Sequence, residues 1–213
     1  MTDVNLVYQH FPALTPRQKE QFAQLDELYR DWNAKINVIS RKDIGNLYPN
    51  HVLHSLAIAK VVRFVDGANV LDLGTGGGFP GIPLAILYPG VQFHLIDGIA
   101  KKINVCTQVA TSLGLTNVHA EQKRAEEIKK PMYDFVITRA VAKMERLAEW
   151  SLRLIARRQR HAIPNGILAL KGMNLSEEMA ALPKGAYLEE YPIKDIFPNV
   201  DFYDAKAVIY YQA

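Results

Sequence analysis

The residues with the clearest chemical potential form a glycine-rich turn that follows a short apolar stretch. Val70–Leu73 has the character of a buried strand, and the string GTGGGFPG runs directly after it, from Gly74 to Gly81. Glycine lets the backbone approach a ligand closely and adopts positive φ without steric cost. In an open α/β sheet, ligands bind at the carboxyl ends of the strands. The turn is therefore a predicted ligand site, and a purely structural turn is the simpler alternative.

Two classes of ligand compete for this turn. Gly76, Gly78 and Gly81 match the dinucleotide fingerprint G-x-G-x-x-G. That fingerprint begins where the strand ends, however, and Asp72 and Gly74 already occupy this point; a carboxylate here would repel a pyrophosphate. The frame D-x-G-x-G-x-G, from Asp72 to Gly78, is similar to motif I of S-adenosylmethionine (AdoMet)-dependent methyltransferases. AdoMet has an ammonium and a sulfonium group but no phosphate, so the charges favour it.

A second acidic residue, about twenty positions beyond the glycines, supports binding of a nucleoside. Asp97 ends the apolar string VQFHLID, which is typical of a second strand. A carboxylate at this point accepts hydrogen bonds from ribose hydroxyls. Asp97 suits NAD and AdoMet equally, so it does not choose between them, and the N-cap of a helix is its alternative role.

The elements that would position these residues alternate between short apolar runs and amphipathic stretches. This alternation is typical of βαβ units and a mostly parallel sheet. The last two β-rich runs are expected to form an antiparallel hairpin on one sheet edge. The predicted strands are 69–74, 91–97, 117–122, 133–139, 166–172, 186–193 and 205–212, and the predicted helices are 82–88, 101–114 and 144–156.

Residues 1–66 are predicted to form a helical arm, and residues 67–213 a single AdoMet-binding domain. Thr15, Pro16 and Gln18 are typical of an N-cap, a first helical residue and a capping box. A second helix is expected from about Asn50 to Phe64. The apolar face of the first helix consists of Phe22, Leu25, Tyr29, Trp32 and Ile36.

Composition excludes several classes of protein. The chain has 213 residues, of which 49% are hydrophobic and 22% charged, as in an ordinary globular protein. Its formal net charge of +3 permits a polyanionic partner without demanding one. The single cysteine, Cys106, is predicted to be buried; it excludes an internal disulfide framework and fits a reducing compartment.

Targeting and metal signals are absent from the sequence. We find no apolar run of about 18 residues and no signal segment at the start, and therefore expect a cytoplasmic protein. The six histidines show neither C-x-x-C nor H-E-x-x-H spacing, which predicts no metal site.

The glycine-rich string resembles the signature of one family, and five further motifs support it. DLGTGGGFPGIPLAI is similar to the signature of RsmG, the glucose-inhibited division protein B family. Each further motif is weak alone, but together, in order and at family-like spacing, they are specific and cover nearly the whole chain. They lie at Trp32–Asn37, His51–Leu56, Lys123–Glu127, Tyr133–Ala140 and Leu170–Gly172.

The resemblance implies a Rossmann-like, class I AdoMet-dependent methyltransferase fold. Its sheet would be mostly parallel and seven-stranded with an antiparallel edge strand, and an N-terminal helical arm would precede it. The implied activity is methylation of N7 of a specific guanine in bacterial 16S ribosomal RNA, by a monomer that meets the RNA or the small ribosomal subunit.

Site residues come from the resemblance and from the glycine frame together. The resemblance carries the family's cofactor contacts to Gly74, Phe79, Ala125, Glu126 and Arg139. With the residues derived above, the predicted cofactor-binding set is Asp72, Gly74, Gly76, Gly78, Phe79, Asp97, Ala125, Glu126 and Arg139.

The sequence departs from the family pattern at three positions. His54 stands where the family has an aspartate, so no role of that carboxylate can be carried over. Gly98 replaces a usual serine, and Ser40 a common threonine.

Methylation of N7 makes modest chemical demands. The nitrogen has a free lone pair, so no general base is needed and positioning dominates. Arg139 ends an apolar strand, where a charge requires a partner such as a phosphate or a carboxylate. It is the predicted orienting residue of the catalytic site, with an ordinary Arg–Asp ion pair as the alternative.

Basic residues near the end of the 144–156 helix are the predicted RNA contacts, because Lys and Arg neutralise phosphates. Residues in a last helical turn also complement the helix dipole, which is the alternative. The predicted RNA-binding set is Arg153, Arg157, Arg158, Arg160 and Lys171.

Two other functions compete with this one. An NAD-dependent oxidoreductase is disfavoured by Asp72 and by the lack of an acid/base pair for hydride transfer. A non-catalytic RNA-binding module would bind RNA but not AdoMet.

Overall fold

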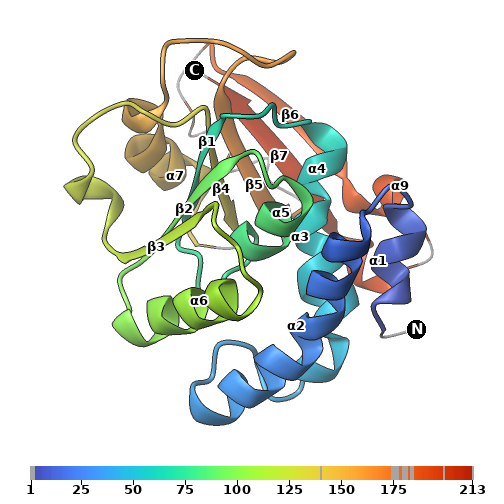
Figure 1. Ribbon diagram of the computed structural model, residues 1–213. Coiled ribbons are helices and arrows are strands. Elements are labelled where there is room, and N and C mark those ends of the chain that lie inside the picture. The colour runs from blue at the N-terminus through green and yellow to red at the C-terminus, as the bar shows by residue number, and fades with distance from the viewer. Residues whose placement is uncertain are drawn as a thin grey trace.

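The computed structural model describes residues 3–139, 141–173, 178, 182, 185–198 and 200–212. Its centre is a seven-stranded sheet in the order β3-β2-β1-β4-β5-β7-β6 (Figure 1). The strands are β1 (Asn69–Leu73), β2 (Gln92–Asp97), β3 (Val118–Gln122), β4 (Phe135–Arg139), β5 (Gly166–Gly172), β6 (Tyr187–Pro192) and β7 (Lys206–Gln212). All seven match predicted strands within about two residues, which is the usual disagreement over element ends.

One strand runs against the others. β7 is antiparallel to β5 and to β6, whereas the pairs β1–β2, β1–β4, β2–β3 and β4–β5 are parallel. The predicted antiparallel hairpin at the sheet edge is therefore confirmed. The antiparallel strand itself lies one place inside, and β6 forms the edge.

The helices confirm the predicted alternation, with changes at their ends. The described helices are α1 (Asn5–His10), α2 (Pro16–Lys35), α3 (His54–Leu56), α4 (Ile58–Val61), α5 (Gly81–Leu87), α6 (Ala100–Ser112), α7 (Met144–Ser151) and α9 (Ile193–Ile196). Short 3-10 turns lie at η1 (Ile44–Asn46), η3 (Ala125–Glu127), η4 (Leu152–Leu154) and η5 (Asp201–Tyr203), and η2 (Leu47–Leu53) is a π-helical segment. In these described parts of the chain, no helix is long and apolar enough to span a membrane.

Two helix predictions were wrong in detail. The single helix expected from Asn50 to Phe64 is instead η2, α3 and α4 in succession, starting at Leu47 and ending at Val61. The helix expected over 144–156 ends at Ser151, and η4 follows it. Apolar spacing alone does not distinguish these tighter and wider turns from an α-helix.

Side chains alternate between two hydrophobic cores, one on each face of the sheet. Phe93 and Leu95 of β2 face the core shared with α2, α5 and α6, whereas Ile96 faces the core shared with α7. Figure 1 shows α5, α6 and the N-terminal helices gathered on one side and α7 on the other. The sheet is thus the middle layer of three.

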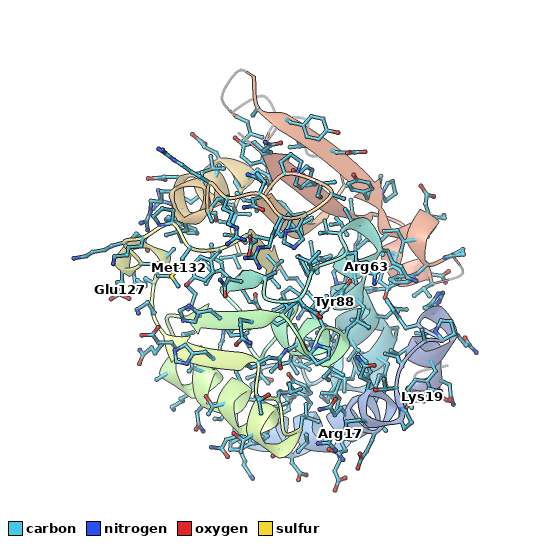
Figure 2. All side chains as sticks on the ribbon, turned by 45° about the horizontal axis from the view of Figure 1, so that its top comes forward. Arg17, Lys19, Arg63, Tyr88, Glu127 and Met132 are labelled. Atoms are coloured by element: carbon cyan, nitrogen blue, oxygen red, sulfur yellow. The ribbon has the colours of Figure 1, made fainter. Side chains whose placement is uncertain are left out.

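The N-terminal segment is packed into the first of these cores. The predicted capping box is confirmed: the Gln18 amide donates to Thr15 Oγ1 at 3.3 Å, and the Thr15 amide donates to Gln18 Oε1 at 2.9 Å. Phe22 is fully buried against residues of the sheet domain. Arg17, labelled in Figure 2, donates to the Leu113 carbonyl at 2.9 Å and so ties α2 to the end of α6.

Because this core is shared, we expect the segment and the sheet to unfold together. Phe22→Ala should lower the free energy of unfolding by about 3–5 kcal/mol through loss of a buried ring. Met132→Ala, which truncates an exposed side chain, is the control and should change it by less than about 0.5 kcal/mol.

Urea unfolding followed by fluorescence measures both effects. The chain has two tryptophans, one in each part: Trp32 reports on the N-terminal segment and Trp150 on the sheet domain. Single-tryptophan variants should show coincident midpoints. Separate midpoints would mean that residues 1–66 unfold independently.

Candidate active site

A buried carboxylate closes the glycine-rich turn. Asp72 Oδ2 accepts hydrogen bonds from Thr75 Oγ1 at 2.7 Å and from the Gly81 amide at 2.8 Å. Burial raises the pKa of Asp72 to about 7. A Cβ at Gly81 would lie 2.7 Å from Asp72 Oδ2, so a larger residue cannot start α5 here. Gly74 has φ +71° and its Cβ would meet Val141 at 2.6 Å, so this position also requires glycine.

Asp97 joins this turn to the end of β2. Its Oδ2 accepts from the Gly76 amide at 3.1 Å and its Oδ1 from the Ile99 amide at 2.9 Å. The Asp97 side chain is 11% exposed, and Lys102 Nζ lies 3.9 Å from Oδ2. Each carboxylate oxygen can accept a further bond from a ligand hydroxyl. Because β1 and β2 are parallel, Asp97 and Gly74 both lie at the carboxyl ends of the strands.

Two adjoining cavities form a cleft at the carboxyl ends of the strands, and both are lined by Gly74, Asp97 and Val141. One, of about 280 Å³, extends past η3 to Trp150; the other, of about 310 Å³, extends to Val38 and Lys102. Of the predicted cofactor-binding residues, seven line the cleft: Gly74, Gly76, Phe79, Asp97, Ala125, Glu126 and Arg139.

The two remaining predicted residues, Asp72 and Gly78, line neither cavity and shape the turn from beneath. Among the lining residues that the sequence did not predict are three apolar ones from separate segments. Val38 comes from the N-terminal segment, Val141 follows β4 and Trp150 lies on α7. All three are apolar, and only the packing of separate segments distinguishes them from ordinary core residues.

Arg139 meets an imidazole and an aromatic ring. Its guanidinium donates to His51 Nδ1 at 3.1 Å and lies 5.1 Å from the centroid of the Phe79 ring. His51 Nε2 in turn donates to Asp43 Oδ2 at 2.6 Å, and the side-chain Nδ2 of Asn50 donates to Asp43 Oδ1 at 2.6 Å. Among the described residues, no carboxylate lies within 4.0 Å of Arg139. The Arg–Asp ion pair considered above therefore does not occur in this part of the chain.

The charges of this group follow from its burial. Burial lowers the pKa of Arg139 to about 10, so the guanidinium is still a cation at neutral pH. Burial and the neighbouring Arg139 charge lower the pKa of His51 to about 4. A neutral imidazole holds Arg139 in place without neutralising it. The cation is thus available to an anionic group in the cleft.

A basic pocket adjoins the cleft on the side of Arg139. Its ionisable lining residues are Arg139, Lys171 and Lys206, the imidazoles of His51 and His54, and one carboxylate, Asp43. The Lys171 ammonium donates to the Ala142 carbonyl at 2.9 Å and to Glu178 Oε2 at 2.5 Å. Lys206 Nζ lies 3.7 Å from the centroid of the Phe202 ring.

His54, where the resemblance led us to expect an aspartate, lies in the wall of this pocket. It is buried against the rings of Phe202 and Tyr203, and its Nε2 has no hydrogen-bond partner among the described residues. Burial and the nearby charge of Arg139 lower the pKa of His54, so it is a neutral group here. An aspartate at this position would bring a negative charge to the pocket that Arg139 and Lys206 line, and His54 does not.

Two of the predicted RNA-binding arginines brace the fold. Arg153 donates to the carbonyls of Ala125 at 2.5 Å and Ile128 at 2.6 Å, and so holds η3 beside the cleft. Arg160 donates to the Gly67 carbonyl at 2.7 Å and lies 3.8 Å from Asp134 Oδ1.

Arg157, Arg158 and Arg160, which were predicted to cluster near the end of a helix over 144–156, are separated from α7 by η4. They lie in the irregular segment between η4 and β5, with Arg157 and Arg158 exposed. Arg160 bonds residues that precede β1 and β4, so this segment lies at the amino ends of the strands. The cleft lies at the carboxyl ends, roughly 17 Å away for a strand of five residues. Only Lys171 of the predicted RNA set lies beside Arg139.

The fold and the cleft define a class of protein. The fold is similar to that of a SAM-dependent methyltransferase from Aquifex aeolicus, with a TM-score of 0.54, 17% identity and coverage of 75% of this chain and 89% of that one. It is also similar to a variant of MtNAS in complex with S-adenosylmethionine, with a TM-score of 0.60, 15% identity and coverage of 92% and 76%. The chain therefore has the fold of the SAM-dependent methyltransferases.

Sequence comparison then specifies the family within that class. The family described as GidB, rRNA small subunit methyltransferase G, matches residues 18–196, and the chain belongs to this family. Ribosomal RNA small subunit methyltransferase G of Flavobacterium psychrophilum is 53% identical over 204 residues, which cover 96% of this chain and 95% of the relative. The protein of that name from Phocaeicola vulgatus is 50% identical over 207 residues, which cover 97% of each chain. The resemblance found in the sequence is confirmed.

The environment of His51 predicts an unusual titration. His51 should stay neutral until the pH falls to about 4, and Arg139→Met should raise its pKa by removing the neighbouring cation. In the unfolded chain this imidazole binds its proton near pH 6.5, so His51 lowers the stability as the pH falls from 6.5 to about 4. NMR titration of isotope-labelled histidines measures the pKa directly. Arg30→Met, on the exposed face of α2, is the matched control, and a wild-type His51 that titrates near 6.5 would contradict the prediction.

Proposed function

We propose that the protein transfers a methyl group from AdoMet to N7 of a guanine in small-subunit (16S) ribosomal RNA. The observation that carries the proposal is the cleft at the carboxyl ends of the strands, which is lined by the glycine turn, Asp97 and Arg139. The target atom and base rest on the family resemblance. Ribosomal RNA as substrate places the reaction in the cytoplasm.

The residues of the cleft suit AdoMet in three respects. Asp97 offers carboxylate oxygens for ribose hydroxyls, and the backbone around Ala125 faces the cavity that runs to Trp150. Arg139 offers a cation for the carboxylate of the methionine part, in the cavity that contains Gly76. When bound, AdoMet supplies a methyl group on a positively charged sulfur.

The protein's part in the reaction is to position the reacting groups and to exclude water from them. Guanine N7 attacks with its own lone pair, so no side chain has to remove a proton, and near-attack placement provides the acceleration. The chain Asp43–His51–Arg139 holds the guanidinium in one orientation, and Phe79 packs against its face. Arg139 is accordingly proposed to orient the bound groups.

The RNA is proposed to lie over the basic pocket beside the cleft. Lys206 and Arg139 bring positive charge to the place where a target base must enter, and phosphates flanking that base would lie near them. Lys171 lies in the same pocket and is paired with Glu178. Arg157 and Arg158 lie at the amino ends of the strands, and a short RNA that enters the pocket does not reach them.

Replacing Arg139 tests the proposed site. Arg139→Met keeps the length of the side chain but removes its charge and its donors. We expect kcat/KM for methylation of 16S RNA to fall by about 100-fold or more, in line with loss of a buried charged donor. Arg30→Met should leave it unchanged. The substrate is RNA from cells that lack the protein, and mapping of N7-methylguanine identifies the product.

Calorimetric titration with AdoMet and with NAD separates the competing functions. The wild-type protein should bind AdoMet and not NAD. Binding of NAD alone would support an oxidoreductase, and RNA binding without AdoMet binding would support a non-catalytic module. If Arg139→Met keeps full activity and the wild-type protein binds AdoMet, the proposed role of Arg139 is rejected but the proposed function is not.

Charge reversal at the carboxyl ends and at the amino ends of the strands tests where the RNA lies. Lys206→Glu should weaken binding of a short 16S RNA fragment about tenfold and reduce the salt dependence by about one phosphate contact. The double variant Arg157→Glu/Arg158→Glu should change the affinity less than about twofold. Filter binding at several salt concentrations measures both. The opposite result would place the RNA at the amino ends of the strands.

A further inference from the structure

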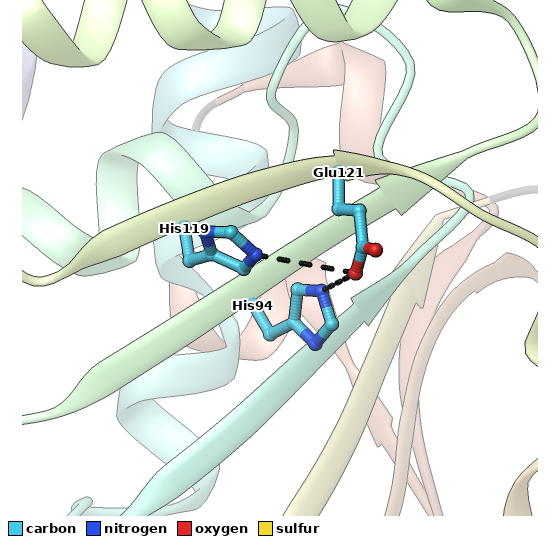
Figure 3. A group of neighbouring side chains, drawn as sticks. All are labelled: His94, His119 and Glu121. Carbon is cyan, nitrogen blue, oxygen red and sulfur yellow. Dashed lines mark hydrogen bonds and ion pairs between the residues drawn. The ribbon is translucent and has the colours of Figure 1, made fainter. Parts of the chain in front are cut away.

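Three side chains with metal-binding groups meet on one face of the sheet, outside the cleft (Figure 3). His94 belongs to β2, and His119 and Glu121 belong to the edge strand β3. Strand pairing sets His94 opposite His119. One ligand atom from each residue lies within 4.8 Å of the other two.

The geometry of this cluster is compact. Glu121 Oε2 lies 3.1 Å from His94 Nε2 and 3.9 Å from His119 Nε2. In a tetrahedral zinc site with bonds of about 2.0–2.2 Å, neighbouring ligand atoms are roughly 3.2–3.6 Å apart. The two observed separations bracket that range, so small side-chain rotations would bring all three atoms onto one ion.

We propose that His94, His119 and Glu121 form a binding site for a divalent transition-metal ion, best suited to Zn²⁺. Two imidazoles and one carboxylate are a ligand set that zinc accepts, with a fourth position left to water. The His119 side chain is 73% exposed, which gives the ion a path from solvent. The site belongs to neither the cleft nor the basic pocket.

A buried tyrosine supports one end of the site. His94 Nδ1 lies 2.6 Å from the hydroxyl oxygen of Tyr133. Metal-binding imidazoles commonly donate their other N–H to such a partner, which fixes the ring orientation and the tautomer. With Nε2 on the ion, His94 Nδ1 carries the proton and donates to Tyr133.

One cation competes with the ion. Lys123 Nζ lies 2.7 Å from Glu121 Oε1, the oxygen that faces away from the imidazoles. This pair leaves Oε2 directed at the two histidines, but its positive charge opposes a second cation nearby. Removing Lys123 should therefore strengthen metal binding, a result that a mere surface histidine would not give.

The bound ion would join the edge strand to its neighbour. β3 has a single partner in the sheet, β2, and it leads into η3 on the wall of the cleft. Because the three ligands meet only in the folded sheet, the ion binds the folded chain in preference to the unfolded one and raises its stability.

The experiment titrates the full chain with a zinc salt alone, in the absence of AdoMet and RNA, by calorimetry and by thermal unfolding. The wild-type protein should bind one Zn²⁺ per chain and melt at a higher temperature with zinc than without it. His119→Gln and Glu121→Gln should weaken binding at least about tenfold, since loss of an outer partner alone commonly costs that much. Lys123→Met should tighten it.

His10→Gln is the matched control, because it removes an imidazole far from the cluster in sequence and should leave zinc binding unchanged. His119 is exposed, so His119→Gln should fold as the wild type does. The proposal is overturned if the wild-type protein binds no zinc at micromolar concentration, or if His119→Gln and Glu121→Gln bind it as tightly as the wild type. Since neither AdoMet nor RNA is present, the outcome does not depend on the proposed function.

Discussion

The site depends on one buried carboxylate, Asp72, at the carboxyl end of the central strand β1. Its Oδ2 accepts from a side chain and from the first amide of α5, while its Oδ1 has no partner among the described residues. A buried carboxylate is costly unless it is hydrogen-bonded. These bonds therefore hold the glycine turn in the one shape that satisfies Oδ2, and both cavities of the cleft begin from that turn.

The N-terminal segment completes what the turn begins. The Tyr29 hydroxyl donates to the Gly77 carbonyl at 2.7 Å, and the Tyr29 ring lies 4.8 Å from that of Phe79. Phe79 then packs on Arg139, which bonds His51 of η2. A continuous series of contacts thus runs from α2 through the turn to β4 and back to the N-terminal segment. The segment is a wall of the site as well as a cover for one face of the sheet.

Basic residues have different roles around the sheet, some bracing the fold and others facing the cleft and the pocket beside it. Arg153 donates to backbone carbonyls at η3 beside the cleft, and Arg160 donates to the Gly67 carbonyl at the amino ends of the strands, which are structural uses of charge. By contrast, Arg139 has only an uncharged hydrogen-bond partner among the described residues, and Lys206 lies over an aromatic ring. At the carboxyl ends, Arg139 and Lys206 are therefore available to an anion, whereas at the amino ends Arg160 braces the fold and Arg157 and Arg158 are exposed.

Local sequence patterns were sufficient for much of this protein. The alternation of strands and helices, the capping box at Thr15, the hairpin at the sheet edge and the glycine turn all follow from neighbouring residues, because each depends on backbone preferences and on spacing along the chain. The family, too, could be recognised from short motifs. Only tertiary structure decided that His51 bonds Arg139, that Arg157 and Arg158 lie opposite the cleft, and that His94 meets His119 and Glu121. These facts depend on which strands pair and how segments far apart in the chain pack, and a linear pattern of residue types carries no record of either.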